Sequence, residues 1–413
     1  MRKILFVMFA ALAFVACDKD FQSQTEKADL EAVVQNNKVS LKQALLYAEN
    51  SVNGINPTTR SAERKVKSTE IYVAKPATRS AEDTEVSFYL INYEDNEGFA
   101  MVSTDCRATP VYAYSDSGNL TPEDFETNPF LKIFRDGSVE QYQIEVASYD
   151  DRLPIELPDS IYGDITRLPI VEYDGGYYYE RRSSETISKE ELLTTYWHQK
   201  SPYGDFCPND TGGCGPVAAA QIMAYHKHPA QFGISLYNWD LMTASSTLSS
   251  EDAGADYVAQ LILDIAEEAD AEYNFGESPI YNTTSTEIVD IKNAFREFDY
   301  SCGHPSSYNI NRVTENIIAE QPVFIGGFND NNKGHAWVID GYRHTAYRTT
   351  YYYTYEPYAR YDTFITSSYT YFHCNLGWGP THTDQLSNNG YYYAYSLLYN
   401  NDLSAIYDIT PNN

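Results

Sequence analysis

The chain has 413 residues, more than one compact core usually holds and enough for two domains with extensions. Hydrophobic residues make up 43% of it and aromatic residues 15%, which excludes a disordered or fibrous class. Its 58 acidic and 29 basic residues give a net charge of −29, which repels a phosphate backbone and an anionic membrane surface. We therefore expect no nucleic-acid partner. The 38 tyrosines favour β structure.

The first seventeen residues have the pattern of an export signal. Arg2 and Lys3 precede an apolar stretch, residues 4–16, that is too short to span a bilayer. Residues 14–17, Phe-Val-Ala-Cys, resemble a bacterial lipoprotein cleavage box, in which the cysteine is acylated and becomes the N-terminus. We expect export to the outer membrane or cell surface with a lipid on Cys17 as the only membrane attachment. Simple secretion is the alternative.

Residues 1–17 are thus assigned to the signal, and residues 18–84 to one helix and a flexible linker. Apolar residues recur at helical spacing after Ser40, which is a suitable N-cap. Residues 56–84 are rich in proline, serine, threonine and basic side chains, as is typical of an exposed flexible segment.

Alternating hydrophobicity begins at residue 85. Two strands, 86–93 and 99–103, flank a polar turn and predict a hairpin. A strand over 111–114 and a helix over 130–148 follow. Together these elements predict a small α+β domain.

The second half of residues 85–185 is predicted to be a linker. Residues 151–185 hold several prolines, a glycine pair and the dibasic pair at 181–182, which is a candidate cleavage site. The second domain is assigned to residues 186–413, and a short helix is expected over 189–196.

The strongest chemical signal is a cysteine among small residues, at 212–216 (Gly-Gly-Cys-Gly-Pro). Proline is tolerated in a first helical turn, and the alanine-rich run that follows favours a helix, which His228-Pro229 ends. Cys214 would then lie at a helix N-terminus, where the helix dipole stabilises a thiolate. The alternative is a buried structural cysteine on a tight turn.

His335 is the best candidate for the base that a thiolate needs. It opens an alternating strand after a polar stretch, so its imidazole would be held rigidly beside a loop. The order and spacing of Cys214, His335 and Asn375 are similar to those of papain-type Cys, His and Asn. Surface positions are predicted for the remaining histidines, which are His198, His226, His228, His304, His344, His373 and His382.

The six cysteines include no CxxC pair, so we expect no zinc site of the cysteine-rich type and no metal or cofactor. The sequence leaves open the pairing of four of them, namely Cys106, Cys207, Cys302 and Cys374.

Five blocks in one order resemble the streptopain family of papain-like cysteine peptidases. They are residues 197–203, 213–226, 321–326, 334–341 and 375–379. Residues 85–118 also look like the propeptide domain of that family. The resemblance implies an α+β protein in which a papain-like catalytic domain follows a small α+β propeptide domain.

Carried over by position, the resemblance implies roles for five residues. Cys214 would be the nucleophile and His335 the base. Gln199 would donate to the oxyanion together with the Cys214 N–H. Asn375 would orient the imidazole, and Trp378 would shield it from water.

Three features depart from the family pattern or extend it. Leu376 replaces the first tryptophan of the usual Trp-Gly-Trp-Gly-Gly sequence, and Pro380 replaces its second glycine. The tyrosine-rich stretch 342–372 replaces a short hairpin, and its alternation predicts a long β-hairpin that rims the cleft.

The resemblance implies an endopeptidase made as a zymogen, which cleaves proteins or peptides through acyl-enzyme chemistry and is inhibited by its own propeptide. One alternative is a catalytically idle relative that binds surfaces. Another is a papain-like amidase or transglutaminase that acts on cell-wall or small substrates.

Overall fold

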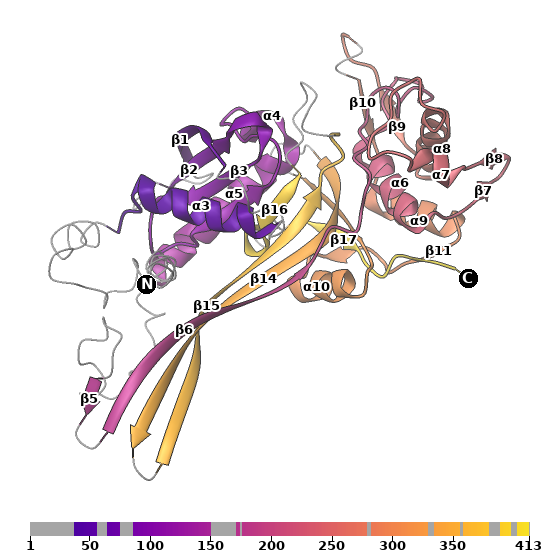
Figure 1. Ribbon diagram of the computed structural model, residues 1–413. Helices are drawn as coiled ribbons and strands as arrows, with labels where there is room; N and C mark the ends of the chain where they lie inside the picture. Colours follow the sequence, from indigo (N-terminus) through magenta and orange to yellow (C-terminus); the bar gives the residue numbers. More distant parts are fainter. Residues whose placement is uncertain are drawn as a thin grey trace.

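The structure is a computed structural model, shown in Figure 1. It describes residues 37–55, 64–74, 86–149, 171–173, 176–278, 282–328, 334–355, 358–379, 389–397 and 403–412. The predicted signal and Cys17 lie outside these ranges. Within the described part of the chain, no helix has the length and apolar character that a bilayer crossing requires.

The N-terminal unit is an antiparallel sheet with helices packed on it. Its strands pair in chain order and are β1 (Val66–Ala74), β2 (Val86–Tyr93), β3 (Phe99–Ser103) and β4 (Val111–Ser115). Its helices are α3 (Leu41–Ile55), α4 (Asp124–Thr127) and α5 (Pro129–Ala147). The hairpin and the helix predicted from the sequence are confirmed as β2, β3 and α5.

Two segments before residue 85 belong to this unit. Ala44, Ala48 and Val52 are fully buried on α3, and β1 extends the sheet along β2. The prediction of a flexible linker over residues 56–84 was therefore wrong for β1. Most of this edge strand is exposed, so its sequence lacks the alternation of a half-buried strand.

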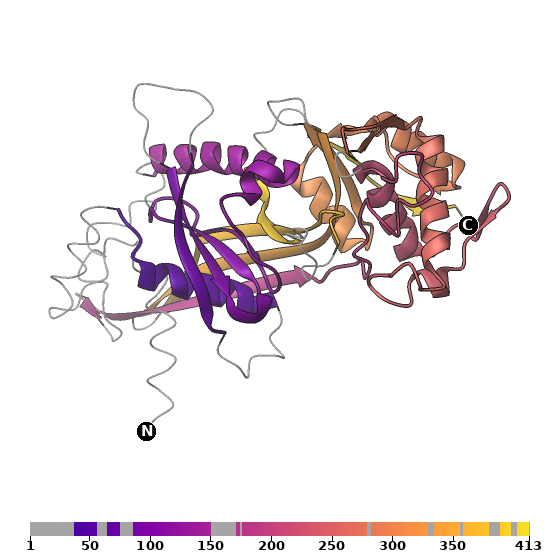
Figure 2. The ribbon, with the colours of Figure 1, turned by 90° about the horizontal axis from the view of Figure 1, so that it is seen from above.

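The C-terminal unit has a helical half and a sheet half. The helical half contains α6 (Cys214–His226), α7 (Trp239–Met242), α8 (Ala255–Glu268) and α9 (Ile288–Glu297), with the short strands β7 (Gln231–Phe232), β8 (Ser235–Leu236), β9 (Glu272–Asn274), β10 (Thr283–Ser285), β11 (Tyr300–Ser301) and β18 (Thr410–Pro411). The sheet half contains β12 (Ser306–Ser307), α10 (Ile310–Ile318), β13 (Val323–Phe328), β14 (Gly334–Tyr355), β15 (Tyr358–Asn375), β16 (Gly390–Tyr393) and β17 (Ser404–Ile406). In Figure 2 the sheet half lies between the N-terminal unit and the helical half.

The two units share one sheet, because β4 pairs with β16 through Tyr114↔Tyr391 and Ala113↔Tyr392. Among the described strands its path runs β1-β2-β3-β4-β16-β15-β14-β13-β17-β12. One hydrophobic core joins the N-terminal unit to one side of the sheet in the C-terminal unit, and a second core joins the opposite side to α6 and α8.

Strand β14 separates these two cores. Trp337 and Ile339 lie in the core shared with the N-terminal unit, whereas Ala336 and Val338 lie in the core shared with α6. This arrangement follows from the strand period of two, which sends successive side chains to opposite faces. Phe130 of α5 contacts Trp337 with ring centroids 4.9 Å apart.

The tyrosine-rich stretch forms the predicted hairpin, in which β14 pairs with β15. Strand β6 (Gly176–Lys189) pairs with the outer part of β14, and β5 (Val171–Tyr173) pairs with β6. The linker predicted over 151–185 therefore ends in a strand, and the expected helix over 189–196 is absent. The outer part of the hairpin, with β6 paired to it, extends away from α6 in Figure 1. The prediction that the hairpin rims the cleft is therefore not supported.

Candidate active site

The N-terminus of α6 is built around Gly213. This residue has φ +83°, and a Cβ there would approach the Thr284 carbonyl to 3.0 Å, so a larger residue would be strained. The first intrahelical bond runs from the Val217 N–H to the Gly213 carbonyl at 3.2 Å. The N–H groups of Cys214 and Gly215 therefore have no carbonyl partner within the helix, as is general for a first turn.

These unpaired groups face the Cys214 thiol. Burial raises the pKa of this thiol, while hydrogen bonds from the backbone N–H groups of Ala336, Gly215 and Cys214 itself lower it. Because Ala336 follows His335, the contact brings the sulfur to the start of β14. The predicted helix with Cys214 at its first residue is confirmed.

His335 is buried, with 4% of its surface exposed. Its Nε2 lies 3.0 Å from the Leu376 carbonyl oxygen. The Trp378 indole nitrogen lies 3.2 Å from the same Nε2. A carbonyl oxygen can only accept and an indole N–H can only donate, so the two contacts require different tautomers of the imidazole. The shorter contact, to the carbonyl, places the proton on Nε2 and leaves Nδ1 as the basic nitrogen. The indole N–H cannot then donate to Nε2, and Trp378 contacts the imidazole by stacking, with ring centroids 5.4 Å apart.

The imidazole is held in its neutral form. Burial lowers the pKa of His335 to about 4, although the Leu376 carbonyl opposes this shift. Its ring also stacks on Trp337, with centroids 6.1 Å apart and an angle of 14°. Among the described residues, no hydrogen bond joins this imidazole to the Cys214 thiol. The thiol thus contacts the backbone one residue after His335, but the thiol and the imidazole are not paired in this structure.

Asn375 ends β15, and its side chain does not bond to the imidazole. Its Nδ2 donates to the Thr195 carbonyl at 2.9 Å, and its Oδ1 accepts from the Gly377 N–H at 3.3 Å. The Leu376 peptide between them also donates its N–H to Asn389 Oδ1 at 2.8 Å. Asn375 thus lies beside the carbonyl that binds the imidazole.

Gln199 lies next to the loop that precedes Cys214. Its backbone carbonyl accepts from the Gly212 N–H at 2.8 Å, two residues before Cys214. The side chain of Gln199 is half-buried and forms no hydrogen bond with the described residues. Its amide is therefore available as a donor.

A buried ion pair that the sequence pattern does not predict lies near the same strands. His373 Nδ1 lies 2.7 Å from Asp340 Oδ1, and the two residues are 6% and 0% exposed. Burial lowers the pKa of His373, but the charge of Asp340 and their hydrogen bond outweigh it and raise this pKa to about 9. The prediction of a surface position was therefore wrong for His373.

This ion pair depends on a β-bulge at Asp340. Where β14 pairs with β15, Ile339 opposes Cys374 and Gly341 opposes His373, so the register shifts at the residue between them. Such a bulge re-aims a side chain, and no local pattern in the sequence announces it.

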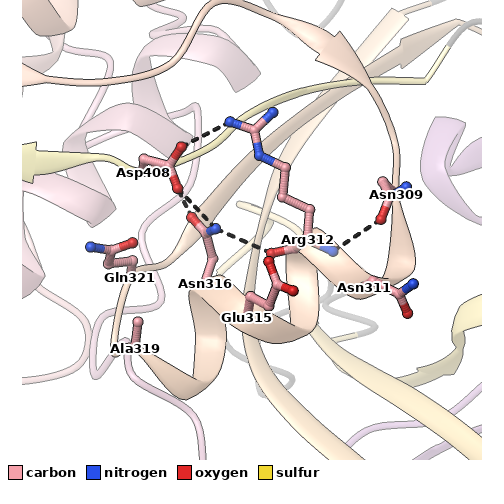
Figure 3. A pocket seen from close by; sticks show the side chains of 8 residues that line it. All are labelled: Asn309, Asn311, Arg312, Glu315, Asn316, Ala319, Gln321 and Asp408. Atoms are coloured by element: carbon pink, nitrogen blue, oxygen red, sulfur yellow. Dashed lines mark hydrogen bonds and ion pairs between the residues drawn. The ribbon is translucent and has the colours of Figure 1, made fainter.

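A cavity of about 590 Å³ opens beside α10, as Figure 3 shows. Two of its charged groups form an ion pair, in which Arg312 donates to Asp408 at 2.8 Å, and Asn316 donates to the same carboxylate at 3.1 Å. None of the predicted site residues lines it, and it offers no nucleophile.

Three cysteines whose pairing was open, Cys207, Cys302 and Cys374, carry free thiols.

Comparisons with known proteins assign a family to each of the two units. Residues 197–392 match the Peptidase C10 family, and residues 36–141 match the family described as Spi protease inhibitor. No curated protein matches the chain. Among solved structures, a fragment of prointerpain A from Prevotella intermedia is similar, with 18% identity and a TM-score of 0.51, over 84% of this chain and 100% of that fragment. At this identity the match supports the fold alone.

The C-terminal unit is thus a cysteine peptidase domain of the C10, or streptopain, family. The inhibitor domain precedes it in the same chain, so the protein is a cysteine-type peptidase with an inhibitory propeptide. The resemblance read from the sequence and the predicted α+β class with a propeptide domain before the peptidase domain are both confirmed.

Proposed function

We propose that the chain is the zymogen of an exported cysteine endopeptidase in which Cys214 attacks the peptide carbonyl. The observation that carries this proposal is the position of the Cys214 thiol at the N-terminus of α6, where backbone N–H groups of its own helix and of β14 favour its charged form. These donors and the helix dipole stabilise a thiolate once the thiol loses its proton.

His335 acts as the base and then as the acid. Its Nδ1 takes the thiol proton, the thiolate attacks the carbonyl carbon, and the imidazolium protonates the leaving amine. Water then attacks the thioester, with Nδ1 again accepting a proton, and the acyl product leaves. The Leu376 carbonyl holds Nε2–H throughout and so keeps Nδ1 as the reactive nitrogen.

Gln199 and the Cys214 N–H serve as the oxyanion donors. The support is that the Gln199 backbone is tied to Gly212 while its side-chain amide is unbonded among the described residues. Asn375 positions the Leu376 carbonyl, and Trp378 covers the imidazole.

The precursor is latent because the pair is kept apart and neutral. The raised pKa of the Cys214 thiol and the lowered pKa of His335 both disfavour an ion pair, and both arise first from burial. His335 stacks on Trp337, which packs against Phe130 of the propeptide. Removal of the propeptide frees this face of β14, and the imidazole then turns to the thiol.

The test compares the matured wild-type protein with Cys214→Ala on a denatured-protein substrate and a peptide library, after titration with a thiol-directed epoxide. We expect internal peptide bonds to be cut and one epoxide to react per wild-type chain, with neither result for Cys214→Ala. Epoxide labelling without any cleavage of peptides would instead support an amidase, and a complete lack of labelling would support the idle relative.

We further propose export with a lipid on Cys17, in line with the signal pattern of residues 1–17. Labelling of cells with a radioactive fatty acid should tag the wild-type protein and leave Cys17→Ala unlabelled. Equal labelling of both would refute the anchor, and mass spectrometry of the mature N-terminus would locate the cut.

A further inference from the structure

Gln221 is a buried side chain that the proposed mechanism does not use. It lies on α6 seven residues after Cys214, about two helical turns further along the same face. No part of it is exposed. Its Oε1 accepts from the Trp197 backbone N–H at 3.0 Å and from the Thr195 hydroxyl at 3.2 Å.

The amide of Gln221 also pairs with the amide of Asn375. Gln221 Nε2 donates to Asn375 Oδ1 at 3.2 Å, and Asn375 Nδ2 donates to Gln221 Oε1 at 3.3 Å. Each side chain thus supplies one donor and one acceptor to the other. Asn375 is 1% exposed, so water cannot replace either bond.

These contacts join the three segments that carry the chemistry. Trp197 precedes Gln199 by two residues, and Asn375 precedes Leu376, whose carbonyl binds His335. Gln221 itself is fixed to the helix of Cys214. One side chain therefore sets the position of the oxyanion donor and of the imidazole relative to the sulfur.

Resting on the proposed function, we infer that Gln221 is a positioning residue, which aligns His335 through Asn375 and Gln199 through Trp197. It does not touch the substrate. A shift of about 1 Å in such a group can lower the rate about 10²-fold, so we expect Gln221→Met to lower kcat per titrated active site by roughly 10- to 100-fold. KM should change much less, because the contacts orient reacting groups.

Gln221→Glu separates positioning from packing. The carboxylate keeps the shape and still accepts from Trp197, but it cannot donate to Asn375 Oδ1. Burial raises the pKa of such a carboxyl group, and the protonated form regains an O–H donor. We therefore expect the kcat of Gln221→Glu, relative to wild type at the same pH, to recover as the pH falls.

The experiment uses the enzyme matured from the full-length precursor, with active sites counted by epoxide titration. Gln260→Met is the matched control, because Gln260 also lies on a helix and donates to one side chain, Asp264 Oδ1 at 2.7 Å, away from the site residues. It should keep wild-type kcat and pH dependence. Thr195→Val removes one hydroxyl that donates to Gln221 and should lower kcat by a smaller factor, so the test does not depend on Gln221→Met folding.

The inference is overturned if Gln221→Glu and Thr195→Val keep wild-type kcat per titrated site and an unchanged pH profile, even with a lower Tm. The inference is also overturned if Gln260→Met loses as much kcat as the Gln221 and Thr195 variants do. A wild-type protein that cleaves no peptide, or a Cys214→Ala variant that still does, would instead refute the proposed function.

Discussion

Phe130→Ala tests whether the propeptide restrains the active site through the core that it shares with β14. Phe130 is fully buried and contacts two rings of the peptidase sheet, Trp337 at 4.9 Å and Tyr392 at 4.8 Å. Truncation of a buried phenylalanine costs about 3–5 kcal/mol. If about 3 kcal/mol of this belongs to the interface, the population of the released state rises about 100-fold, because each 1.4 kcal/mol is roughly a factor of ten.

The assay follows the appearance of epoxide-reactive sites in the purified full-length precursor at fixed concentration. We expect the rate for Phe130→Ala to exceed the wild-type rate by about the same factor of 10², since release precedes the reaction. Phe125→Ala is the matched control. Phe125 is equally buried, but its ring stacks on Tyr72 inside the propeptide at 4.7 Å.

The comparison of these two variants decides the cause. A much larger rate for Phe130→Ala than for Phe125→Ala supports restraint through the interface. Equal rates would mean that the stability of the propeptide itself controls release. A wild-type rate in Phe130→Ala would refute the reasoning altogether.

Three further changes have definite expected results. Gln199→Ala should lower kcat of the matured enzyme by about 10²–10³ with little change in Tm, as expected for loss of one oxyanion donor. Burial lowers the pKa of His335 to about 4, so between pH 6.5 and 4 the unfolded chain binds a proton on this imidazole and the folded chain does not. The free energy of unfolding of the precursor, measured by urea titration, should therefore fall by up to about 3 kcal/mol over this range. The fall should be smaller in His335→Gln. The pKa of His373 is raised to about 9, so the stability that its pair with Asp340 contributes is complete below pH 6.5 and is lost as the pH rises through 9. His373→Gln should flatten this dependence of stability on pH. An unchanged dependence in the variant would contradict the assignment of this ion pair.

The sequence predicted the elements whose signals are local. The glycines and the proline around Cys214, with the alanines after them, define a helix start without help from the rest of the fold. The alternation after His335 likewise defines β14. These two signals place both proposed catalytic side chains correctly on their elements.

Features that depend on distant partners could not be predicted. Strand β6 looks like a linker because its partner, β14, lies far along the chain and supplies the pairing. His373 is buried because Asp340 occupies a bulge on the neighbouring strand. The group that binds the His335 imidazole is the backbone carbonyl of Leu376, and a backbone group leaves no trace in a side-chain pattern.

Consecutive residues of β14 contact the propeptide and the Cys214 thiol. Trp337 packs on Phe130 of the propeptide, whereas the N–H of Ala336 reaches the Cys214 thiol from the same stretch of backbone. A well-packed core resists small displacements, so movement of Trp337 when Phe130 leaves must be absorbed by the strand that also carries His335. In the proposed function, β14 is therefore the element through which loss of the propeptide would rearrange the thiol and the imidazole.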